Sequence, residues 1–137
     1  MAGAAELGSL GVTEAHVRDI KESDWRLLRK LQPVALERFC QRVLSEVQSA
    51  CSAPAQTNHQ RYLRVFATVQ DRNEEMARAF DDIRRSNAFT RLAVMRSSDL
   101  ISAEEFSGFS EETRSLVEVL LGNGAAQQGA AADARDQ

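Results

Sequence analysis

The feature that most constrains this 137-residue chain is a long segment without glycine or proline. Neither residue occurs between Asn58 and Ser98, and a series of mostly apolar positions recurs there at alternating spacings of four and three. The series is Tyr62, Phe66, Val69, Asn73, Met76, Phe80, Ile83, Asn87, Thr90 and Val94. This spacing is the heptad pattern of a helix with one apolar seam. It predicts one continuous helix over about 58–97, roughly 60 Å long at a rise of 1.5 Å per residue.

The apolar face of this helix is wider than the seam of a two-stranded coiled coil. The positions that flank the seam, where a dimeric zipper usually carries charges, are occupied by Leu63, Val65, Ala77, Ala79 and Ala93. A wide apolar face is typical of a helix that contributes to a bundle core. The pattern therefore predicts a helical bundle.

A second helix is predicted over about 23–52, with Ser23 or Asp24 as its cap. Its apolar positions keep one helical phase from Trp25 to Val47, although Pro33 interrupts the run. We therefore expect one kinked helix in preference to two. The segment 53–57 is the clearest loop, and it should connect the two helices as an antiparallel hairpin.

Two short helices are predicted after Ser98. Ser102 and Glu105 have the spacing of a capping box, and Ser110 should begin a last helix that ends at Gly122. The fold class is therefore all-α, a long antiparallel hairpin completed by short C-terminal helices. We expect a disordered N-terminus over 1–12, one helical domain over 13–122 with a short amphipathic turn near its start, and a disordered low-complexity tail over 123–137.

The unequal lengths of the two long helices predict an overhang. A helix that ends near residue 97 would extend about 15 Å past its partner, and the apolar segment 88–94 would need a cover. The segment 13–20, the C-terminal helices or a second subunit could supply it, and a homodimer of two hairpins fits well. Asn73 and Asn87 occupy seam positions, where a buried polar residue specifies register or oligomeric state. The alternative is that the seam is locally hydrated there, or that each amide binds loop backbone.

The segment FDDIRRS, residues 80–86, resembles a catalytic or metal-binding cluster at first sight. The heptad instead places Asp81, Asp82 and Arg85 on the outward side of the helix. Pairs of acid and base four residues apart, such as Asp81 with Arg85 and Glu74 with Arg78, stabilise an exposed helix face. We interpret the segment as a solvated ladder of ion pairs, because general acid–base catalysis requires a cleft that shifts pKa values.

Charge is distributed unevenly along the chain. The net charge is −3, but the segment from Asp99 onward carries eight acidic residues against two arginines. Residues 84–98 contain four arginines and no acid, so Arg84, Arg91 and Arg96 could form a stripe that contacts nucleic acid or a partner. The other interpretation is that the acidic C-terminal helices cover these arginines inside the fold.

No catalytic, metal or cofactor motif occurs in the sequence. His16 and His59 are isolated, and neither Cys40 nor Cys51 lies beside a histidine. Two free thiols, no apolar run long enough to span a bilayer and no signal-peptide pattern predict a cytoplasmic protein. We expect a non-enzymatic interaction module, an adaptor or regulatory subunit that binds itself and another protein. A helical nucleic-acid-binding regulator is the alternative.

Overall fold

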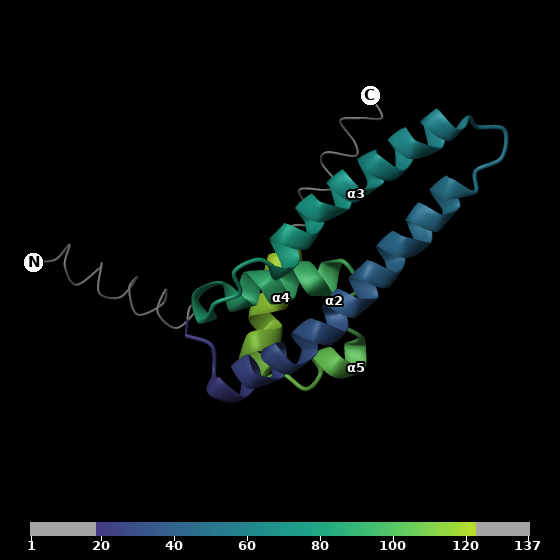
Figure 1. Ribbon diagram of the computed structural model, residues 1–137. Helices are drawn as coiled ribbons and strands as arrows, with labels where there is room; N and C mark the ends of the chain where they lie inside the picture. The colour runs from purple at the N-terminus through teal and green to yellow at the C-terminus, as the bar shows by residue number, and fades with distance from the viewer. Residues whose placement is uncertain (1–18, 123–137) are drawn as a thin grey trace, which may run out of the picture.

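The structure is a computed structural model that describes residues 19–122. Helices α2 (Glu22–Cys51) and α3 (Asn58–Phe80) form an antiparallel hairpin. Helices α4 (Ala88–Ser97) and α5 (Ala103–Phe106) and a last helix over 111–122 gather at one end of this hairpin (Figure 1). Every regular element among the described residues is helical, which confirms the all-α prediction. The predictions for 1–12, for the turn after residue 12 as far as residue 18, and for 123–137 lie outside the described residues.

Helix α2 runs through Pro33 as a single element, as its unbroken apolar phase predicts. It begins at Glu22, one residue before the predicted range, and its N-cap Lys21 makes no side-chain capping bond. Asp24 is therefore not the cap of this helix. Its side chain is only 2% exposed and bonds a distant part of the chain, as described below.

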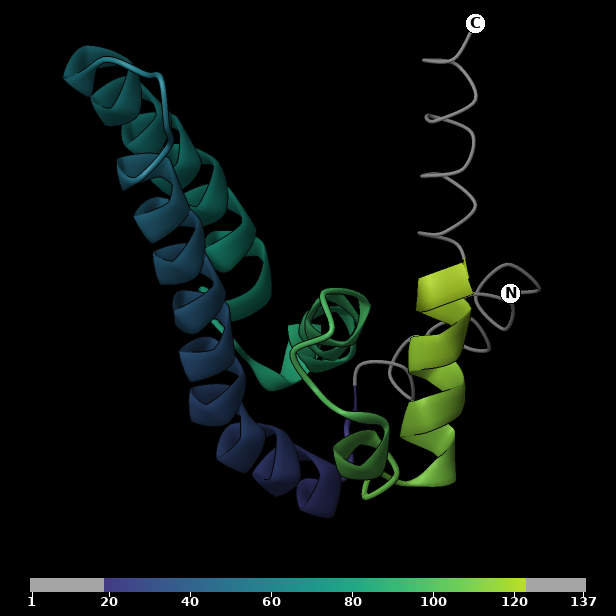
Figure 2. The ribbon, with the colours of Figure 1, turned by 90° about the vertical axis from the view of Figure 1, so that its right-hand side faces the viewer.

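The hydrophobic core lies at the base of the hairpin, between the N-terminal half of α2 and the helices that follow α3. Leu28, Leu92 and Val117 are fully buried there, and each comes from a different helix. The rings of Phe39 and Phe80 meet edge to face at a centroid distance of 6.2 Å. The distal half of the hairpin extends away from this core (Figures 1 and 2).

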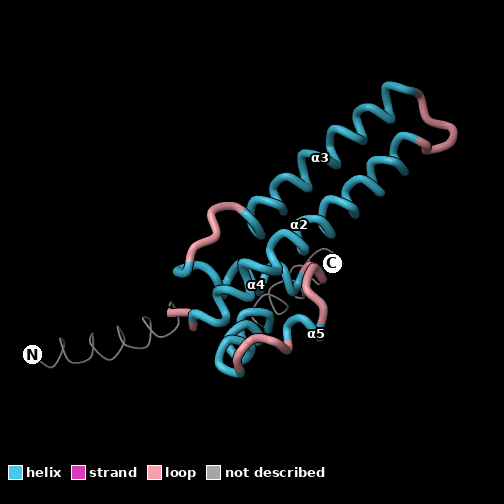
Figure 3. The backbone as a smooth tube through the Cα atoms, turned by 60° about the horizontal axis from the view of Figure 1, so that its bottom comes forward, coloured by secondary structure: helices cyan, strands magenta, loops and turns pink. Residues whose placement is uncertain are grey.

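The predicted helix over 58–97 is interrupted, and its overhang does not exist. Helix α3 ends at Phe80, and a turn that includes the short 3-10 helix Arg85–Asn87 leads into α4 (Figure 3). Asp82 takes the left-handed conformation, with φ of 52°. The break allows α4 to fold back, so that Phe89 and Leu92 are buried in the core. A continuous helix would have left these side chains in solvent, and their burial is the physical reason for the break.

The segment FDDIRRS belongs to this turn, so its interpretation as an outward helix face is wrong. Arg84 Nε lies 2.9 Å from Asp82 Oδ1, and Arg85 reaches back to Glu22 at 3.0 Å. Among residues 19–122, the ion pairs do not include Glu74–Arg78 or Asp81–Arg85, the predicted ladder. The charged residues of the segment stabilise a turn.

The chain from the end of α4 contains one helix end that the sequence analysis did not predict and two helix starts that it did. Helix α4 ends in a Schellman motif, in which the Leu100 N–H donates to the Met95 carbonyl at 2.9 Å and Asp99 is left-handed with φ of 58°. Ser102 and Glu105 then form the predicted capping box at the start of α5. The last helix begins directly after Ser110, as predicted.

Candidate interaction face on the helical hairpin

Large apolar side chains are exposed along the distal half of α3. Tyr62 is 65% exposed, Phe66 53%, Leu63 49% and Val69 40%. Tyr62, Phe66 and Val69 belong to the predicted seam, and Asn73, the next seam residue, is also exposed. The first half of the seam therefore faces solvent, and only its later residues approach the core, where Phe80 is buried.

The reason lies in how α3 contacts α2. The half-buried positions of α3 recur at a helical spacing one residue before the seam, at Val65, Thr68 and Arg72. Successive helical residues are turned by about 100°, so Phe66 points well away from the direction in which Val65 meets α2. The hairpin contact thus uses one stripe of α3 and leaves the neighbouring apolar stripe uncovered.

Helix α2 adds to the same side of the hairpin. Val43 is half-buried, and Leu44, one step further along the helix, is 61% exposed. In two antiparallel helices, the residue that follows a contact residue in the sequence points to the same side of the pair on both helices. Leu44 therefore shares a side with Phe66. We call this surface the hairpin face and define it as Leu44, Tyr62, Leu63, Phe66 and Val69.

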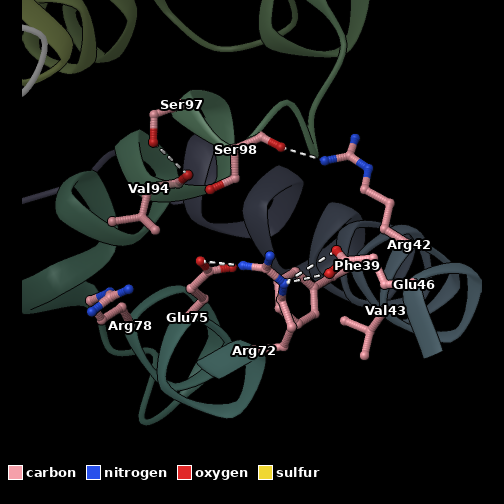
Figure 4. A pocket seen from close by; sticks show the side chains of 10 residues that line it. All are labelled: Phe39, Arg42, Val43, Glu46, Arg72, Glu75, Arg78, Val94, Ser97 and Ser98. Atoms are coloured by element: carbon pink, nitrogen blue, oxygen red, sulfur yellow. Dashed lines mark hydrogen bonds and ion pairs between the residues drawn. The ribbon is translucent and has the colours of Figure 1, made fainter. Parts of the chain in front are cut away.

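The other side of the hairpin is covered by the rest of the domain. Figure 2 shows α4, α5 and the last helix together on one side of the α2–α3 pair. A cavity of about 500 Å³ opens between the hairpin and α4, and Arg42, one step before Val43, lines it (Figure 4). Among the described residues, no element covers the hairpin face.

Most of the charged side chains that line the cavity bond one another or backbone carbonyls. Arg72 donates to Glu46 at 3.2 Å and to Glu75 at 2.6 Å, and these two bonds raise the pKa of Arg72 above its ordinary value (Figure 4). Arg42 donates to the Ser98 carbonyl at 2.5 Å and also to the Asp99 carbonyl, at the C-terminal end of α4. The Arg42 bonds fasten α4 to the hairpin, and of the charged side chains in this lining only Arg78 has no such bond among the described residues.

Two further polar groups hold the base of the hairpin together. The Asp24 carboxylate accepts bonds from the Ser110 N–H at 2.9 Å and from the Ser110 and Thr113 hydroxyls at 2.6 Å each. Burial raises the pKa of Asp24, but these bonds outweigh it and place that pKa below its ordinary value. Sequence reasoning missed this role because the partners are 86 and 89 residues away.

Arg38 and Glu105 form the second group. The Arg38 guanidinium donates to both Glu105 carboxylate oxygens, at 2.7 and 2.9 Å, and to the Leu100 carbonyl at 2.8 Å. Hydrogen bonds from Arg38, and then from the Ser102 backbone, lower the pKa of Glu105 to about 2. This fork connects α2 to α5 and adds no free charge to the hairpin face.

The three arginines predicted to form a stripe are placed in separate internal contacts. Arg91 donates to the carbonyls of Ala77 and Arg78 at the end of α3. Arg96 donates to the Ile101 carbonyl at 2.7 Å, and Arg84 pairs with an aspartate of its own turn. Each guanidinium bonds within the domain, but none of these bonds is made to an acidic residue of the C-terminal helices, the cover that the second interpretation expects.

The two seam asparagines have different surroundings. Asn87 lies in the turn before α4, where its side-chain oxygen accepts from the Arg84 N–H at 2.8 Å and its amide donates to the Asp82 carbonyl at 2.9 Å. These bonds match the alternative in which the amide of a seam asparagine binds loop backbone. Asn73 remains on the exposed stripe of α3 and continues the line of the hairpin face.

The described residues hold no group of three or more histidine, cysteine or acidic side chains that could bind a metal ion. Cys40 and Cys51 are free thiols, and Cys51 is exposed near the tip of the hairpin. No helix within residues 19–122 is long and apolar enough to cross a membrane. No known family model matches this sequence, and no significant match occurs among curated proteins or solved structures.

Proposed function

We propose that this protein is a small, non-enzymatic interaction module whose contact surface is the hairpin face. The observation that carries the proposal is the exposure of five large apolar side chains, each between 40% and 65%, on one side of an arm that extends from the core. Isolated apolar residues are common on protein surfaces, but a contiguous apolar patch is typical of a binding site.

The energetics of the face support a protein partner. Full burial of one such side chain contributes about 1.5–3 kcal/mol, so covering five half-exposed ones contributes on the order of 5 kcal/mol. A groove-binding helix or a second hairpin would cover them along their whole length. The cytoplasm is our proposed compartment, because the free thiols of Cys40 and Cys51 fit a reducing environment.

Site-specific photo-cross-linking in the expressing cell tests this proposal. A benzoylphenylalanine replaces Phe66 on the hairpin face, or Asp71 as a matched control. Asp71 is exposed on the same helix but turned about 140° from Phe66. We expect discrete cross-linked products from position 66 that Leu44→Glu removes. Equal products from both positions, or products insensitive to Leu44→Glu, would refute the proposal.

A further inference from the structure

We infer that the cavity between the hairpin and α4 binds a small organic monocarboxylate, a molecule with one carboxylate group on an apolar body. This cavity lies on the side of the hairpin that α4 covers, away from the hairpin face, so the inference goes beyond the proposed function and does not rest on it. Three features of the described residues carry it: the way the cavity is formed, the charge that its lining leaves unpaired, and an apolar wall beside that charge.

The cavity forms where α2, α3 and α4 meet, and its walls are fixed without a ligand. Its volume of about 500 Å³ is within the range of small-molecule sites. Arg42 on α2 bonds the carbonyls of Ser98 and Asp99 at the end of α4, and Glu46 on α2 pairs with Arg72 on α3. These bonds hold the three helices around the opening, so the cavity is preformed and binding requires little rearrangement of the backbone (Figure 4).

The lining carries one positive charge in excess. Three arginines and two glutamates line the cavity, and both glutamates bond the same arginine, Arg72. Arg42 bonds backbone carbonyls, which orient its guanidinium but carry only partial negative charge. A single carboxylate would neutralise this excess. A cationic ligand would have to displace Arg72 from its two glutamates.

Arg78 is the guanidinium that is available to the carboxylate. It lines the cavity, and its side chain makes no hydrogen bond or ion pair among residues 19–122. The acidic residues within one turn of it that lie outside the lining, Glu74, Asp81 and Asp82, are all exposed, and none of them pairs with it. Their charges lie in water, where salt screens them. The planar fork of a guanidinium matches the geometry of a carboxylate, with which it forms two parallel hydrogen bonds.

An apolar wall lies in the same cavity as Arg78. Phe39 and Val43 from α2 and Val94 from α4 contribute side chains to the lining (Figure 4). An inorganic anion would leave these side chains in contact with water, whereas the apolar body of an organic acid would cover them, which is favourable. The combination of one unpaired guanidinium and an apolar wall therefore selects a molecule that is charged at one end and apolar at the other.

Amide NMR spectra of the isotope-labelled full chain, recorded during a titration with octanoate, test the site. Octanoate is a carboxylate on an unbranched alkyl chain. We expect saturable shifts at the amides of Arg78 and of residues 94–98, with Kd on the order of 1 mM or below. Octanol has the same chain without the charge, octylammonium has the opposite charge, and inorganic phosphate lacks the apolar body. Each of these three probes should bind at least about 10-fold more weakly than octanoate.

A matched pair of arginine variants tests the role of Arg78. Arg78→Gln should raise the Kd of octanoate at least about 10-fold, because it removes the charge and the guanidinium fork. Arg64→Gln is the control, because Arg64 is exposed on the same helix but does not line the cavity. Its Kd should stay within about twofold of wild type. Both side chains are exposed, so neither substitution removes a core contact, and the amide spectrum of each free variant verifies its fold.

Four results would overturn this inference. Octanoate could cause no saturable shift up to about 10 mM, or octanol could bind as tightly as octanoate. Arg78→Gln could leave the Kd unchanged. The shifts could occur at Leu44 and Phe66, which would place octanoate on the hairpin face. None of these results affects the cross-linking from position 66, so the proposed function is tested separately.

Discussion

Replacing Asp24 with asparagine tests whether one buried carboxylate holds the last helix against α2. The carboxylate accepts three hydrogen bonds from Ser110 and Thr113, and Thr113 is itself only 2% exposed. Hydrogen bonds to a charged acceptor contribute about 1.5–3 kcal/mol each, against about 0.5–1.5 kcal/mol for neutral partners. A charged acceptor is thus better than a neutral one by about 1 kcal/mol per bond, or about 3 kcal/mol for three bonds. Burying a neutral amide costs less than burying a carboxylate, which reduces this loss. We expect Asp24→Asn to lose about 2–3 kcal/mol at pH 7.

Urea unfolding followed by circular dichroism measures this loss, with Asp71→Asn as the control. Asp71 is exposed, so the control should change the free energy of unfolding by less than about 0.5 kcal/mol. The pH dependence gives a second test. Because the folded pKa of Asp24 is depressed, its stabilisation is complete above the unfolded value near 4 and is lost as pH falls through the folded pKa. The gap between wild type and Asp24→Asn should therefore narrow in acid. Equal losses for Asp24→Asn and Asp71→Asn at pH 7 would refute the reasoning.

Three further perturbations address the base of the hairpin and the turn. Glu105→Gln should lower Tm by about 5 °C at pH 7. This difference in Tm should vanish as pH falls from about 4.5 to about 2, the pKa that Arg38 imposes on Glu105. A difference in Tm that stays constant in calorimetry across that pH range would contradict this prediction. Phe80→Ala, at a site 8% exposed, should cost about 3–5 kcal/mol in urea unfolding, and a loss under 1 kcal/mol would mean that its contact with Phe39 is not part of the core. At Asp82, where φ is 52°, valine should be at least about 1 kcal/mol less stable than glycine, and equal thermal midpoints would show that the left-handed turn does not form.

The sequence predicts the local elements of this fold well. The phase of the apolar residues carries α2 correctly through Pro33, and the loop at 53–57 correctly marks the end of the hairpin. Ser102 and Glu105 form the capping box that their spacing indicates. Each of these features depends on residues that are close in the sequence, so their positions alone specify the local hydrogen bonds.

The sequence does not predict where the long helix breaks. The heptad series continues in phase from Phe80 to Asn87, and no glycine or proline marks the turn. The break is decided by tertiary contacts: Phe89 becomes buried at the base, and Arg91 reaches the carbonyls that α3 exposes at its end. The arginines between residues 84 and 98 resemble a binding stripe for the same reason. The role of Arg91 at the end of α3 can be predicted only when the position of the break is known.

The heptad pattern also identifies the apolar stripe of α3 but not the surface that it meets. Within one chain, α3 contacts α2 through Val65 and Thr68, and the stripe of Phe66 and Val69 is left over. The stripe of α3 that faces α2 includes Thr68 and Arg72, whereas the neighbouring exposed stripe carries the larger apolar side chains of the wide face noted in the sequence. Among residues 19–122 no element covers this exposed stripe, and its exposure is the basis of the binding role proposed above. The position of the break therefore bears on the proposed function: the turn at 81–87 folds α4 back to one side of the hairpin, and within residues 19–122 the other side stays uncovered.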